Sequence, residues 1–249
     1  MKKDVLLITP PFTQLNTPYP ATVYLKGFLN TKQISSFQID IGIEVIVALF
    51  SNESLKELFN FAVENNAITS ENSQRIYALK NDYLTTINTV ISFLQGENQT
   101  LARQICTDNY LPEASRFEQL DDMEWAFGSM GIQDKAKHLA TLYLEDLSDF
   151  IKECVDEIFG FSRYAESLGK SANSFDELYS SLQGKLTYID NITLTILDEN
   201  LKKVQPKRPA CSKAAVTKPK ASPHGLRPFS WLLHRFALCW QLKQAQRLG

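Results

Sequence analysis

Two short segments near the start of the chain could bind a cofactor, because each follows a predicted β-strand. The first is Thr-Pro-Pro-Phe at residues 9–12, and the second is Asp-Ile-Gly at residues 40–42. Open α/β sheets bind cofactors outside the carboxyl ends of their strands. We therefore predict six cofactor-binding residues: Thr9, Pro10, Pro11, Phe12, Asp40 and Gly42. The alternative is that the prolines only end a strand and the aspartate only caps a turn.

The elements that would position these residues form a predicted βαβ unit. Residues 4–9 are a short, mostly apolar run that stops at two prolines, which is typical of a strand buried in a parallel sheet. Residues 20–30 begin with a proline suited to a first helical turn. We expect this helix to pack on the sheet through side chains at helical spacing: Tyr24, Leu25, Phe28 and Leu29. Residues 37–41 alternate between apolar and polar side chains, which indicates a second strand. We expect the crossover between the strands to be right-handed.

From residue 43 to about residue 201 the pattern is almost wholly helical. Apolar residues recur three and four positions apart in segments 43–50, 53–65, 70–94 and 99–106. The clearest apolar stripe runs through residues 138–161, with carboxylates largely on the opposite face. A last helix is predicted over residues 188–204.

Titratable side chains in this helical region admit a chemical and a structural interpretation. His138 lies at helical spacing from Asp134 and Glu145, so an acid–base or metal site is conceivable, but a surface histidine is the preferred interpretation. Helices that bind two iron ions carry Glu-x-x-His pairs, and none occurs here. We therefore expect a solvated acidic face, formed by Asp146, Asp149, Glu153 and Asp156.

No catalytic residue and no metal ligand is predicted. The sequence has neither a glycine-rich phosphate loop nor a nucleophile elbow. Its cysteines show neither the pairing of a disulfide framework nor the clustering of a zinc site: Cys106, Cys154, Cys211 and Cys239. An apolar cluster is expected to be core, with a loop over the crevice as the alternative: Trp125, Phe127 and Met130.

The charge pattern changes near residue 205. Residues 205–249 hold nine of the 26 basic residues and five of the ten prolines, whereas all 28 acidic residues lie before them. A nucleic-acid arm and an amphipathic membrane anchor over residues 229–242 are the functional alternatives for this tail. We favour neither, and expect a tail that is disordered or encoded out of frame, without an evolved function.

We predict three regions: the start of an α/β domain at 1–50, a helical region at 51–204 and the irregular basic tail at 205–249. Residues 207–213 place charges and prolines where a core strand needs apolar β-formers, so the sheet should stop after two strands and leave apolar helix faces exposed. Apolar residues make up 44% of the chain and charged residues 22%, which is ordinary for a soluble protein. No apolar run is long enough for a membrane span or a signal peptide, so a cytoplasmic location is expected.

The N-terminal residues also carry a family resemblance. The residues that carry it are Val5-Leu-Leu-Ile-Thr-Pro-Pro-Phe12, the helix with Leu25 and Leu29, and Asp40 at the end of the second strand. They resemble the opening of the cobalamin-binding (B12-binding) domain that precedes the barrel of B12-type radical SAM proteins. The resemblance covers about the first fifty residues. It implies an incomplete Rossmann-like βαβ unit, with the helical region as a large insertion before the third strand.

The resemblance further implies radical chemistry on an unknown substrate in an intact parent protein. Such a protein would use S-adenosylmethionine, a [4Fe-4S] cluster and cobalamin. This chain lacks Cys-x-x-x-Cys-x-x-Cys, whose thiolates hold the cluster, and Asp-x-His-x-x-Gly, which supplies a histidine to cobalt. We expect an inactive N-terminal fragment, truncated or frameshifted after about residue 204. The alternative is a non-enzymatic helical interaction module whose basic tail binds nucleic acid or another partner.

Overall fold

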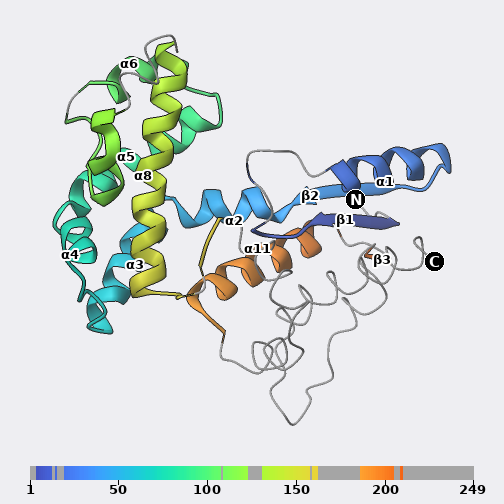
Figure 1. The fold of residues 1–249 in the computed structure, drawn as a ribbon. Helices are drawn as coiled ribbons and strands as arrows, with labels where there is room; N and C mark the ends of the chain where they lie inside the picture. Colours follow the sequence, from blue (N-terminus) through green and yellow to red (C-terminus); the bar gives the residue numbers. More distant parts are fainter. Residues whose placement is uncertain are drawn as a thin grey trace, which may run out of the picture. The chain divides into compact units, whose positions relative to one another are not determined.

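The structure is a computed structural model (Figure 1), and it describes residues 4–12, 15, 20–107, 109–122, 131–157, 159–161, 186–204 and 208–209. These residues are mostly helical, with a parallel strand–helix–strand unit near the N-terminus. The chain separates into two compact units. We call Met1–Ile46 with Phe161–Gly249 the α/β unit, and Val47–Gly160 the helical unit.

The α/β unit is built on two parallel strands, as the sequence predicts. β1 (Val5–Thr9) pairs with β2 (Ser36–Asp40) along its whole length, so that Thr9 lies opposite Asp40. Helix α1 (Pro20–Thr31) makes the connection between them. The predicted βαβ unit is therefore confirmed.

A third strand forms where the sequence predicts none. β3 (Arg208–Pro209) pairs in parallel with the other edge of β1, opposite Val5 and Leu6, which gives the strand order β2-β1-β3. The expectation of a sheet limited to two strands is wrong to this extent. β3 is only two residues long, and a proline has no N–H with which to extend the ladder.

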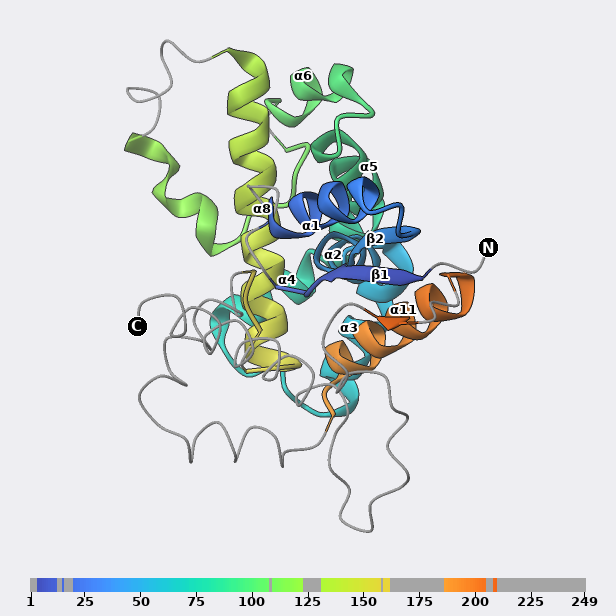
Figure 2. The ribbon, with the colours of Figure 1, turned by 90° about the vertical axis from the view of Figure 1, so that its right-hand side faces the viewer.

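Helices lie on both faces of this small sheet. Figures 1 and 2 show α1 on one face and α11 (Tyr188–Val204) on the other. The bounds of α11 agree with the predicted last helix. The Asn200 side chain of α11 donates a 2.6 Å hydrogen bond to the Glu44 carboxylate at the start of α2 (Ile41–Leu49), which joins these two helices.

The helical unit consists of short helices packed around one long helix. Serine caps explain two of the helix starts, because the Ser51 and Ser70 hydroxyls accept hydrogen bonds from backbone N–H groups in the first turns. The predicted helix over 70–94 is instead two helices, because the backbone leaves the helical conformation at Leu79. The elements are α3 (Asn52–Glu64), α4 (Glu71–Ala78), α5 (Lys80–Leu94), η1 (Gln99–Leu101), α6 (Ala102–Ile105), η2 (Ser115–Asp122) and α8 (Ile132–Cys154).

Helix α8 forms the centre of the core of the helical unit. The helix spans Ile132–Cys154 rather than residues 138–161, and five residues of the predicted stripe are buried: Tyr143, Leu147, Phe150, Ile151 and Cys154. The ring centroids of Phe150 and Phe59 are 5.0 Å apart, and those of Tyr143 and Tyr83 are 5.1 Å apart. The Tyr143 hydroxyl donates to the Tyr83 carbonyl at 3.1 Å, so its polar end is satisfied inside the core.

Replacing Leu147 with alanine should destabilise the helical unit strongly. Leu147 is fully buried on α8, so Leu147→Ala removes apolar contacts and leaves a cavity that costs about 2–5 kcal/mol of unfolding free energy. Leu94→Ala is the matched control, since Leu94 is 37% exposed at the end of α5 and should cost much less. Urea unfolding followed by circular dichroism measures both, and equal losses would contradict this core.

Candidate functional site

The two predicted cofactor-binding segments lie side by side. Thr9 and Asp40 are opposite each other in the parallel ladder and are the last residues of β1 and β2. Residues 10–12 and Gly42 continue from these two strand ends. The fold therefore brings all six predicted residues to one edge of the sheet, as expected for adjacent parallel strands.

The Thr9 side chain holds α1 on the sheet. Thr9 is buried, and its hydroxyl lies 3.3 Å from the Thr22 hydroxyl of α1. The Gln38 amide of β2 also donates to the Thr22 hydroxyl, at 2.9 Å. Thr22 therefore links α1 to both strands through a buried polar junction, and the Thr9 hydroxyl already has a partner within the fold.

Asp40 is the cap of α2. One of its carboxylate oxygens accepts the backbone N–H of Ile43 at 3.2 Å, which satisfies a free donor in the first helical turn. Gly42 is buried within that same turn. The geometry supports a capping role for Asp40, which is the alternative that the sequence leaves open.

The turn after β1 is apolar and buried. Pro10 and Pro11 are both buried, and Phe12 is 5% exposed. The backbone of Phe12 has a φ of 58°, in a left-handed region that a bulky side chain rarely adopts and that costs on the order of 1 kcal/mol or more. Burial of the phenylalanine ring offsets this strain.

The side chains at this edge of the sheet are mostly apolar and buried. Of the six predicted residues, only Asp40 is half-buried, and the others are buried. Among the described residues, the one histidine is His138, which lies in the helical unit. No group of three or more His, Cys, Asp or Glu side chains in the described part of the chain is arranged to hold a metal ion.

The two described cysteines are not activated nucleophiles. Cys106 and Cys154 are free thiols of the helical unit, and burial raises the pKa of each thiol above its usual value. A raised pKa keeps the sulfur protonated at neutral pH, whereas the thiolate is the reactive form. Cys211, Cys239, the predicted cluster at Trp125, Phe127 and Met130, and the tail segment 229–242 lie outside the described residues.

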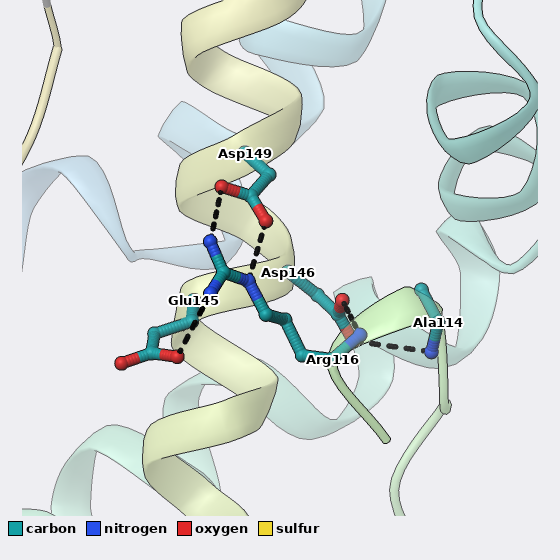
Figure 3. A network of polar contacts seen from close by, with 5 residues as sticks. All are labelled: Ala114, Arg116, Glu145, Asp146 and Asp149. Atoms are coloured by element: carbon teal, nitrogen blue, oxygen red, sulfur yellow. Dashed lines mark hydrogen bonds and ion pairs between the residues drawn. The ribbon is translucent and has the colours of Figure 1, made fainter. Parts of the chain in front are cut away.

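A buried carboxylate in the helical unit was not predicted from the sequence. Asp146 of α8 is fully buried, and its carboxylate accepts the backbone N–H groups of Ala114 at 3.1 Å and Arg116 at 3.0 Å (Figure 3). The prediction of a solvated acidic face is therefore wrong for Asp146. It is also wrong for Asp156, which follows the end of α8 and is 4% exposed.

Arg116 completes this network on the surface side. Its guanidinium makes two hydrogen bonds to Asp149, of 2.6 and 2.8 Å, and lies 3.6 Å from a carboxylate oxygen of Glu145 (Figure 3). The residues from Ala114 to Arg116 are thereby fastened to α8 by both backbone and side-chain contacts. This network therefore holds the start of η2 against α8.

Burial raises the pKa of Asp146 to about 6. The two backbone N–H groups favour the charged form and oppose this shift, as does the nearby Arg116, whereas the charge of Asp149 adds to it. The net direction is upward because the carboxylate loses its hydration when η2 packs over α8. The acid is therefore partly protonated in mildly acidic solution.

Comparison with models of known families, with curated proteins and with solved structures finds no match to this chain. Within the described ranges, no helix has the length and apolar character needed to cross a membrane. Any assignment of function therefore rests on the sequence and the geometry of the chain itself.

Asp40→Ala should lower the unfolding free energy by about 0.5–2 kcal/mol, because it removes the cap of α2. Asp40→Asn should retain most of the stability, since an amide oxygen can accept the same Ile43 N–H. Thermal unfolding of the two variants beside the unaltered chain measures the difference. Equal stability of all three chains would show that the capping contact contributes nothing.

The burial of Asp146 predicts a pH dependence of stability. An acid whose pKa is raised in the folded state binds more protons folded than unfolded, so stability falls as the pH rises between the two pKa values. Relative to Asp146→Asn, the unaltered chain should lose roughly 2–3 kcal/mol of unfolding free energy between about pH 4 and about pH 6. Above about pH 6 the difference in unfolding free energy should stay constant.

Urea unfolding over this pH range measures the slope, and Asp134→Asn controls for removing one exposed carboxylate from the same helix. A stability difference that rises with pH would show that the two hydrogen bonds from Ala114 and Arg116 outweigh the loss of hydration.

Proposed function

We propose that the α/β unit is the start of a cobalamin-binding domain of the kind that precedes the barrel of radical SAM proteins, and that this chain alone is not an enzyme. The observation that carries the proposal is the parallel β1-α1-β2 unit, whose strands end side by side at Thr9 and Asp40. An incomplete, Rossmann-like unit of this kind agrees with the resemblance in the first fifty residues.

The strand order supports a ligand crevice at the end of β1. The chain moves from β1 to β2 in one direction and then returns past β1 to β3, so right-handed crossovers place the connecting helices on opposite faces. Doubly wound sheets bind ligands at the carboxyl ends of the strands where this direction reverses. That place in this chain is the turn formed by Thr9, Pro10, Pro11 and Phe12.

The residues at this edge fit the nonpolar part of such a site. Pro10, Pro11 and Phe12 would form the apolar base of one rim of the site, since all three residues are buried. Thr9 and Asp40 would act indirectly, because they hold α1 and α2 in place. None of the six residues supplies a cobalt ligand of the histidine type.

Cobalamin and a [4Fe-4S] cluster with S-adenosylmethionine would together supply radical chemistry on an unknown substrate in an intact parent protein. The cluster motif is absent from all 249 residues, so this chain would not hold the cluster. Its proposed contribution is limited to the rim of the cofactor crevice and to the helical unit inserted between β2 and β3.

A non-enzymatic interaction module is the second candidate, and one observation favours it. Tyr24, Leu25 and Phe28 of α1 are exposed, although their helical spacing predicts a face that packs on the sheet. A basic tail that binds nucleic acid is the other part of this candidate. Nucleic-acid binding that survives deletion of residues 205–249 would show that the tail is not its source.

Hydroxocobalamin should bind the full chain, and Phe12→Ala should weaken this binding by at least about tenfold because the rim loses its ring. Equilibrium dialysis with the absorbance of cobalamin as the signal measures the affinity. Phe117→Ala is the matched control, because Phe117 is 6% exposed in the helical unit, close to the 5% of Phe12.

The two substitutions should therefore lower stability to a similar extent, whereas only Phe12→Ala should affect cobalamin. A chain that unfolds cooperatively but binds no cobalamin would contradict the proposal. Equal weakening by the two variants would remove the proposed crevice from the end of β1.

A further inference from the structure

We draw no further inference here: the strongest candidate, the surface patch formed by the exposed side chains of Tyr24, Leu25 and Phe28 on helix α1, carries nothing because nothing in the structure shows what covers it.

Discussion

The parallel pairing of β1 with β2 is the constraint on which the α/β unit depends. Parallel neighbours cannot be joined by a tight turn, so the chain must cross over the sheet, and α1 is that crossover. The same pairing brings Thr9 and Asp40 to one edge. Because β3 pairs with the other side of β1, that edge lies where the winding of the chain changes direction.

Each unit contains a buried polar junction that joins its elements. The two junctions differ in the free energy that their polar groups lose on leaving water. Thr22 joins α1 to the sheet through neutral groups, which lose little when they leave water as hydrogen-bonded partners. Asp146 joins the start of η2 to α8 through a charge, and its desolvation exceeds the benefit of its hydrogen bonds. The second junction therefore depends on pH.

The residues predicted to bind a cofactor serve the fold first. Asp40 caps α2, Thr9 supports α1, and the ring of Phe12 is buried beneath a strained turn. A structural role does not remove a residue from a binding site, because a rigid rim needs such support. It does mean that the surroundings these residues can offer a ligand are largely nonpolar. The large apolar side chains of α1 are exposed and take no part in this support.

The sequence by itself determined the strand–helix–strand order and where most of the helices lie, because side-chain periodicity and proline positions act locally. It also predicted the edge formed by Thr9 and Asp40, since adjacent parallel strands must end together. Only the tertiary structure decided that Asp146 is buried, that Arg208 pairs beside Val5, and that large apolar side chains of α1 are exposed. Each of these depends on contacts between residues far apart in the chain, which no local pattern records.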